Sequence, residues 1–336
     1  MPKYHVYGVG NALVDKEFEV EDEFFAEQNI EKGIMTLVEH EQQDQLLKTL
    51  TSRYGVRGQS GGGSAGNTMY ALSNFGGEAY YACKVANDDT GDYFLDQLGH
   101  HNIDTNVSQR ESGTSGRCLV MVTPDAERTM MTYLGVSADI SLAEMDFDAA
   151  QDSEYIYIEG YLVTSPPAKA AILALKKFAR EHGIKVAMTF SDPAMLEYFK
   201  DDINDVLEGG VDLLFCNMKE AQLWSGEQDI DKACLALEGI ARQFVVTRGP
   251  EGALAFDGRE YIPIAGNPVK AIDTNGAGDL FAGAFLYAVT QDRDFATAGK
   301  LASLASSRLV TQYGPRLPAA EHEELREEVM GSIVAT

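Results

Sequence analysis

A glycine-containing run between two acidic residues, Asp273-Thr274-Asn275-Gly276-Ala277-Gly278-Asp279, is the segment whose residue types are best suited to chemistry. Small and apolar residues follow at 280–290 and predict a buried helix. Backbone N–H groups at its start would lack helical partners and, with the positive end of the helix dipole, they predict an anion site. Asp279 would then lie in the first turn, beside a bound phosphate. The same pattern also fits an ordinary helix start with a favourable acidic residue.

A second glycine cluster, Gly61-Gly62-Gly63-Ser64-Ala65-Gly66, matches the G-x-G-x-x-G spacing of dinucleotide-binding sites. That fingerprint requires a strand directly before it, whereas residues 52–59 are polar and interrupted by glycine. The sequence therefore disfavours a nicotinamide cofactor, and an oxidoreductase stays only as a remote alternative. The glycines would still allow close backbone approach, and Asn67 offers donors and an acceptor to a neutral polar ligand.

Composition and charge bound the class of protein. The 336 residues include 27 Lys and Arg against 52 Asp and Glu, and the net charge of −25 argues against nucleic acid or an anionic membrane as the main partner. We read no signal peptide and no apolar run of about 18 residues, so we expect a cytoplasmic protein without membrane spans. The four scattered cysteines and six histidines lack metal-ligand spacing, which disfavours zinc chemistry.

The elements that would position these residues follow an α/β pattern. The apolar run Tyr4–Val9 predicts a buried first strand, and strands alternate with helices from about residue 154, which indicates a parallel sheet covered by helices. Residues 117–122 and 128–133 are β-rich runs joined by a turn sequence that contains Pro and Asp, and they predict an antiparallel hairpin. Residues 17–31 are acidic and show no clean helical stripe. We expect one large α/β domain with a small β appendage.

The run from Asp273 to Asp279 resembles the D-T-x-G-A-G-D signature of the ribokinase-like (PfkB) carbohydrate and nucleoside kinases. Further parts follow in that family's order: residues 11–15 resemble its first-strand segment, 61–67 its early glycine and asparagine contacts, 217–220 its N-x-x-E element, and 247–252 its T-x-G-x-x-G turn. Each part alone would fit an ordinary turn or helix cap. Because they occur together, from about residue 6 to residue 315, the chain is identified as a member of this family.

The resemblance implies the layout of the fold. We expect a three-layer αβα core with a mainly parallel sheet and a small β lid. The core would comprise residues 1–12, 38–112 and 136–336, and the lid residues 13–37 and 113–135.

The resemblance also implies the roles of the site residues. ATP would donate the phosphoryl group with Mg²⁺ as cofactor, Asp279 would act as general base, and the N–H groups of Gly276, Ala277 and Gly278 would stabilise the transferred group. Implied substrate contacts are Asn11, Asp15, Gly62, Gly63, Asn67 and Glu159. Implied ATP contacts are Asn217, Thr247, Arg248, Gly249, Gly252 and Thr274. Asn217 and Glu220 would serve Mg²⁺ through water, since this ion dehydrates reluctantly.

The acceptor is the least determined part. Residues 11–15, 113–135 and 159–161 look most like the adenosine-kinase branch, which implies conversion of adenosine to AMP. Tyr133, Tyr161 and Phe190 are candidate platforms for purine bases, although each also fits core or lid packing. A kinase for ribose, fructose or a similar sugar, and a non-catalytic nucleoside sensor, are the alternatives. Monomer and homodimer both stay open.

Overall fold

The computed structural model describes residues 2–105, 107 and 110–331, and its largest element is a nine-stranded sheet of order β14-β13-β12-β11-β10-β9-β1-β5-β6. Pairing is parallel from β6 to β12 and antiparallel at β13 and β14. The strands are β1 (Tyr4–Val9), β5 (Ala79–Ala82), β6 (Ile103–Asp104), β9 (Ser153–Glu159), β10 (Lys185–Thr189), β11 (Val211–Asn217), β12 (Ala241–Thr247), β13 (Ala253–Phe256) and β14 (Tyr261–Ile264).

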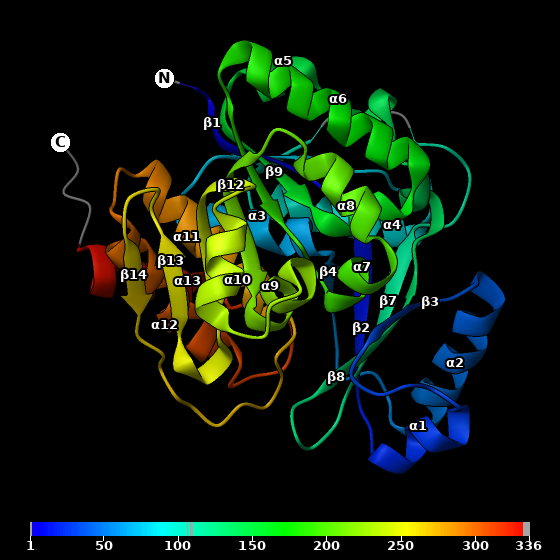
Figure 1. Cartoon of the computed structure of the whole chain (residues 1–336). Helices are drawn as coiled ribbons and strands as arrows, with labels where there is room; N and C mark the ends of the chain where they lie inside the picture. Colours follow the sequence, from blue (N-terminus) through cyan, green and yellow to red (C-terminus); the bar gives the residue numbers. More distant parts are fainter. Residues whose placement is uncertain (1, 106, 108–109, 332–336) are drawn as a thin grey trace.

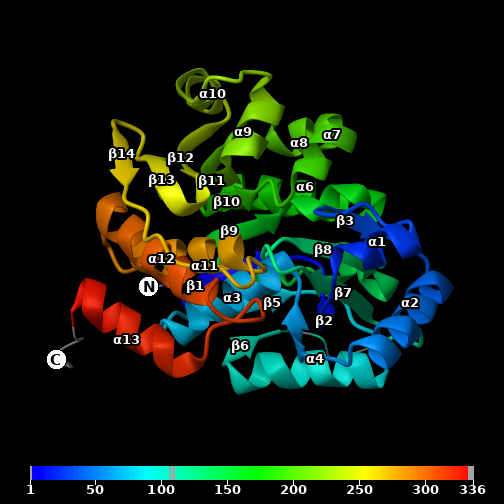
Figure 2. The ribbon, with the colours of Figure 1, turned by 90° about the horizontal axis from the view of Figure 1, so that it is seen from below.

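Helices cover both faces of this sheet (Figure 2). On one face lie α3 (Ser64–Asn74), α4 (Asp89–His100), α11 (Ala277–Thr290), α12 (Phe295–Leu309) and α13 (Ala319–Met330); on the other lie α5 (Phe147–Gln151), α6 (Pro166–His182), α7 (Pro193–Tyr198), α8 (Lys200–Leu207), α9 (Met218–Ser225) and α10 (Ile230–Leu237). In the central strand β9, Tyr155 and Tyr157 belong to one buried cluster and Ile156 and Ile158 to the other. This strand is therefore apolar on both faces, as a parallel sheet between helical layers requires.

A smaller five-stranded sheet of order β3-β8-β7-β2-β4 stands beside the core (Figure 1). Its strands are β2 (Leu13–Glu19), β3 (Met35–Leu37), β4 (Gly58–Gly62), β7 (Gly116–Val122) and β8 (Arg128–Tyr133). The helices α1 (Asp22–Gln28) and α2 (His40–Arg53) bury its outer face through a cluster that includes Phe24, Leu50 and Leu119. We call this sheet and its two helices the lid.

The main features of the predicted layout are confirmed. The αβα core, the mainly parallel sheet and the antiparallel β7–β8 hairpin are all present. Three local expectations differ. Residues 17–31 do contain a helix, α1. The helix that the alternation predicts after β10 is divided into α7 and α8 at Phe199, whose φ of −129° and ψ of 27° are not helical. The stretch 52–59, which we read as lacking a strand, ends in Gly58 and Gln59, and these begin β4, which pairs antiparallel with β2.

β4 and α2 also bear on the proposed division of the chain. Both pack with the lid, so residues within the range 38–112 contribute to it as well as to the core. The exact division stays a proposal. Among residues 2–105, 107 and 110–331, no helix is both long enough and apolar enough to span a bilayer.

Candidate active site

A cleft of about 430 Å³ runs between the inner face of the lid and the carboxyl ends of the core strands. It joins residues that are far apart in the sequence, from Asn11 after the first strand to Val310 after α12. Asp279, in the first turn of α11, lines its middle. One half of the cleft lies under the lid and the other lies between the turn at 247–252 and α12.

Asp279 is held by two side chains of α3. The Ser64 hydroxyl donates to Oδ1 at 2.7 Å and Asn67 Nδ2 donates to Oδ2 at 3.1 Å. Burial raises the pKa of Asp279 above its ordinary value, while these two hydrogen bonds and the nearby charges of Arg128 and Arg316 act in the opposite direction. The carboxylate is therefore positioned and partly desolvated, as a general base must be.

At the start of α11, where the sequence predicts an anion site, two of the three N–H groups have no acceptor among the described residues. The Ala277 N–H is engaged by the Thr274 carbonyl at 3.3 Å, whereas those of Gly276 and Gly278 have no hydrogen-bond acceptor in the described part of the chain. Gly276 caps the helix with φ of +71°, and a Cβ there would collide with Pro315, so glycine is required. A Cβ at Gly278 would meet no atom within 4 Å, so this position faces open space in the cleft.

The polar end of the lid half is built around Asp15 and Asn67. Arg316 Nε donates to Asn67 Oδ1 at 3.0 Å, and burial raises the pKa of Asp15 to about 7, a shift that the Arg316 charge opposes. A Cβ at Gly62 would collide with the Asp15 carboxylate. Gly63 has φ of +82°, and a Cβ there would strike the Asn11 carbonyl. The two glycines thus allow the backbone to lie close to the Asp15 carboxylate and the Asn11 carbonyl, and their role as substrate contacts stays a prediction.

Glu159 lies at the same end but is fully buried, and its oxygens bond the protein itself. They accept hydrogen bonds from the Asn11 N–H at 3.1 Å, Asn11 Nδ2 at 2.8 Å and the Ala65 N–H at 2.8 Å. Burial raises the pKa of Glu159 to about 7. The carboxylate fixes the chain after β1 to the start of α3, so its role as a direct substrate contact remains a prediction.

Asn217 and Glu220 line the other half of the cleft and bond each other. The Asn217 side chain accepts from the Glu220 N–H at 2.9 Å, while the two Glu220 oxygens accept from the Asn217 N–H at 2.8 Å and Nδ2 at 2.9 Å. This is a capping box at the start of α9. No group of three or more metal-ligating His, Cys, Asp or Glu side chains occurs in residues 2–105, 107 and 110–331. The two side chains are bonded to each other, and their service to Mg²⁺ through water stays a prediction.

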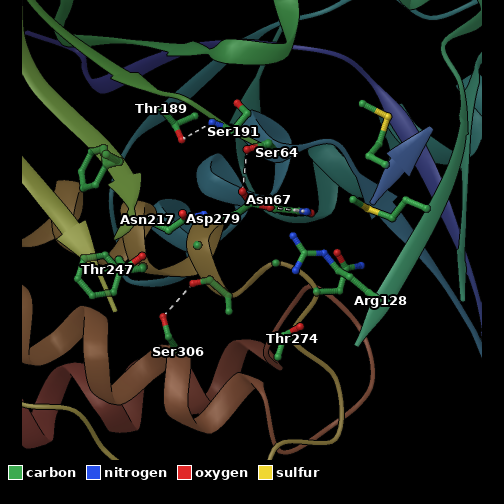
Figure 3. Close-up of a pocket in the computed structure, with 18 of the residues that line it drawn as sticks. Ser64, Asn67, Arg128, Thr189, Ser191, Asn217, Thr247, Thr274, Asp279 and Ser306 are labelled. Atoms are coloured by element: carbon green, nitrogen blue, oxygen red, sulfur yellow. Dashed lines mark hydrogen bonds between the residues drawn. The ribbon is translucent and has the colours of Figure 1, made fainter. Parts of the chain in front are cut away.

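The predicted ATP contacts divide into two groups. Thr247, Gly249, Gly252 and Thr274 line the cleft, and Ser306, which donates to the Ala277 carbonyl at 2.9 Å, lies beside them (Figure 3). Arg248 is not among the lining residues. Its guanidinium contacts the Glu251 carbonyl, and its charge acts on Cys234, which lies on α10. The turn places the neighbours of Arg248 in the cleft, but the Arg248 side chain lies outside it.

Sequence reasoning missed two arginines. Arg128, at the start of β8, lines the cleft and points toward Asn67 and Asp279 (Figure 3). It forms no ion pair with any described residue, and its Nε is buried without a partner. Arg316 follows α12 and reaches α3 from a distant part of the chain. The sequence signal that could have indicated Arg128 was its position next to a predicted hairpin turn. No local sequence pattern indicated Arg316.

The aromatic candidates differ in their placement. Tyr161 lines the cleft, but Tyr133 and Phe190 do not. Tyr133 packs against His40 with ring centroids 5.1 Å apart, and Phe190 stacks on Trp224. Tyr133 and Phe190 therefore serve packing, the reading that the sequence had left open beside stacking.

The chain is similar in sequence and fold to known kinases. Residues 35–322 match the sequence model described as pfkB family carbohydrate kinase. A probable sugar kinase from Rhizobium etli has 33% identity and a TM-score of 0.93 over 99% of this chain and 100% of its own. Adenosine kinase from Sinorhizobium meliloti has 32% identity and a TM-score of 0.91 over 97% of this chain and 99% of its own. Adenosine kinase from Saccharomyces cerevisiae is 24% identical over 93% of this chain and 96% of its own. Mouse ribokinase is 26% identical over 67% of this chain and 70% of its own.

Proposed function

The chain belongs to the pfkB family of carbohydrate kinases, and from this premise we propose that it transfers the γ-phosphoryl group of ATP to the primary hydroxyl of a nucleoside, adenosine to AMP. The observation that carries the choice of acceptor is the two-part character of the lid half of the cleft. Asp15, Asn67 and Asn11 form a polar end, and Leu13, Met35 and Met130 form an apolar one. A ribose bearing a flat base, whose faces can contact apolar side chains, matches both parts, whereas a free sugar would leave the apolar part unfilled.

The chain's own residues supply a mechanism for this transfer. Asp15 and Asn67 bind the ribose hydroxyls and orient the primary hydroxyl toward Asp279, which accepts its proton. The N–H groups of Gly276 and Gly278 donate to the transferred phosphoryl oxygens, where negative charge develops. Arg128 adds a positive charge from the lid side.

The donor would occupy the other half of the cleft. The turn that carries Thr247, Gly249 and Gly252 would hold ATP against α12. Mg²⁺, when bound with ATP, neutralises phosphate charge, and Asn217 and Glu220 would reach it through water. Closure of the lid would exclude water from the reacting groups.

An acceptor screen tests the proposal. ATP consumption is measured with adenosine, ribose and fructose, and the product is identified by ³¹P NMR. We expect turnover with adenosine and a product phosphorylated on the 5′ oxygen. Turnover with ribose or fructose and not with adenosine would replace this proposal with the sugar-kinase alternative, which the likeness to a probable sugar kinase and to ribokinase keeps in view. Binding of adenosine without any turnover would favour the sensor alternative.

A further inference from the structure

We propose that the cleft recognises the base of its acceptor by shape and not by hydrogen bonds to the base edge, so that the enzyme accepts 6-oxopurine nucleosides such as inosine and guanosine as well as adenosine. This inference rests on the proposed function and adds the breadth of its acceptor class. It follows from the side chains and backbone groups of the apolar part under the lid.

One face of the lid sheet supplies this apolar part. Alternate residues of β8 face the cleft, since Arg128, Met130 and Thr132 all line it. Leu13 on β2, Met35 and Leu37 on β3 and Leu134 after β8 complete the surface. Aliphatic and thioether side chains contact the faces of a flat ring, but they cannot distinguish an amino group from a carbonyl on its edge.

The hydroxyl groups of Thr132, Thr164 and Ser191 near this surface each make one hydrogen bond within the protein. Thr132 Oγ1 donates to Cys118 Sγ at 3.3 Å, and Thr164 Oγ1 donates to the Tyr161 carbonyl at 2.9 Å. Ser191 Oγ accepts from the Gly160 N–H at 2.8 Å. A hydroxyl that still reached the base could rotate to accept from an amino group or donate to a carbonyl, so it would serve either substituent.

Backbone groups are also committed at this face. Residues 130–132 of β8 lie between two neighbours, β3 on one side and β7 on the other. The Met130 N–H donates to the Ile34 carbonyl and the Thr132 carbonyl accepts from the Val38 N–H. Strand β8 therefore offers no free donor–acceptor pair at these residues that could read a base edge in the way that one base reads another.

Groups capable of such reading gather at the other end of this half. Asn11, Asn67 and Asn275 line the cleft beside Asp15 and Asp279, and the Arg128 guanidinium points toward Asn67 and Asp279 (Figure 3). Among the described lining residues, the amide and carboxylate side chains of this half thus lie at the ribose and transfer end. The side chains that can select by hydrogen bonding therefore contact the sugar, and the base is held by apolar contacts.

The size of the expected selectivity follows from this distribution. A site built to hydrogen-bond a substrate group rejects an analogue without it by about 10⁴- to 10⁵-fold, whereas an apolar pocket discriminates by only about 10- to 200-fold. We therefore expect kcat/KM for inosine and guanosine to lie within about 200-fold of the value for adenosine.

The test measures kcat/KM for adenosine, inosine and guanosine with the wild-type enzyme and with Thr132→Val, with ribose as a further acceptor. We expect all three nucleosides to be substrates, with Thr132→Val changing their values in parallel. A preference for adenosine above about 10³-fold, or a change of more than about 10-fold in the adenosine-to-inosine ratio in Thr132→Val, would overturn the inference. Exclusive use of adenosine would leave the proposed function intact, whereas activity on ribose alone would remove both.

Discussion

The Ser64 hydroxyl donates to Asp279 Oδ1 at 2.7 Å although the two residues are 215 positions apart in the sequence. Ser64 is the first residue of α3 and Asp279 lies in the first turn of α11, so the contact joins the starts of two helices. Close approach of these helices depends on Gly283, where a Cβ would lie 2.5 Å from the Thr68 carbonyl. The proposed base is thus positioned by the packing of the core as much as by its own loop.

Ser64→Ala should shift the pH dependence of turnover. The Ser64 hydrogen bond favours the ionised form of Asp279 and lowers its pKa, so removal of the hydroxyl raises that pKa. Because a general base must be ionised, the acidic limb of the kcat–pH profile should move upward by about one pH unit. Ser73→Ala on the same helix is the matched control, since Ser73 donates to the His101 carbonyl at the other end of α3. An acidic limb that does not move would show that Ser64 does not tune the base.

Adenosine affinity should weaken as the pH falls through about 7. Burial raises the pKa of Asp15 to about 7 in the ligand-free protein, so Asp15 becomes protonated below that pH and loses capacity to accept ribose hydroxyls. We expect the Kd, measured calorimetrically without ATP, to rise by up to about 10-fold from pH 8 to pH 6. Asp15→Asn should bind more weakly at pH 8 and show little dependence on pH. An equally steep dependence in Asp15→Asn would assign the effect to another group.

Thr274→Val should weaken the contact between the lid and the core. Thr274 Oγ1 donates to the Ala126 carbonyl at 3.3 Å. This hydrogen bond joins the tip of the β7–β8 hairpin of the lid to the loop before α11. Ala126 has φ of +65°. Loss of one neutral hydrogen bond corresponds to about 0.5–1.5 kcal/mol, so ATP hydrolysis relative to phosphoryl transfer should rise by about 2- to 10-fold at saturating ATP. Thr290→Val, at the other end of α11, is the control. The same ratio in both variants would argue against a latch at Thr274.

Glu17→Gln should stabilise the protein more at pH 8 than at pH 5. Glu17 is buried beside Gly58 and Gly314, and burial raises its pKa from 4.5 to about 8, with Asp273 and Asp15 acting in the same direction. The folded protein retains a proton that the unfolded chain releases above its ordinary pKa, so stability is lost as the pH rises from about 4.5 to about 8. Glu17→Gln removes this loss of stability. We expect the gain in Tm of the variant over the wild type to be at least about 2 °C larger at pH 8 than at pH 5. The exposed Glu23→Gln is the control; an equal gain at both pH values would contradict the argument.

The fold was largely predictable because its strands are strong local signals. Tyr4–Val9 and the runs at 116–122 and 128–133 combine apolar residues with clear turn sequences, and they form β1, β7 and β8. The helix α1 was missed because it has only seven residues and buries only Phe24 and Phe25, too few to display a helical period. β4 was missed because its sequence, Gly-Gln-Ser-Gly-Gly, has no strand preference and is held in place by β2.

The candidate site was predictable where a motif lies in one segment, as in residues 273–279. It was not predictable where tertiary packing decides which way a side chain points. Arg248 belongs to a turn whose neighbours line the cleft, yet its side chain lies outside it. Arg316 reaches Asn67 across 249 positions, and no local pattern encodes that contact.

The turnover of Asp279→Asn with adenosine and ATP tests the central claim most directly. The substitution keeps the size of the side chain and an oxygen for Ser64 or Asn67, but it removes the proton acceptor. We predict that kcat falls by about 10²-fold or more, while the Kd for adenosine, measured separately, changes by less than about 3-fold. A variant that binds adenosine normally and turns over at a rate near that of the wild type would contradict the assignment of Asp279 as the base.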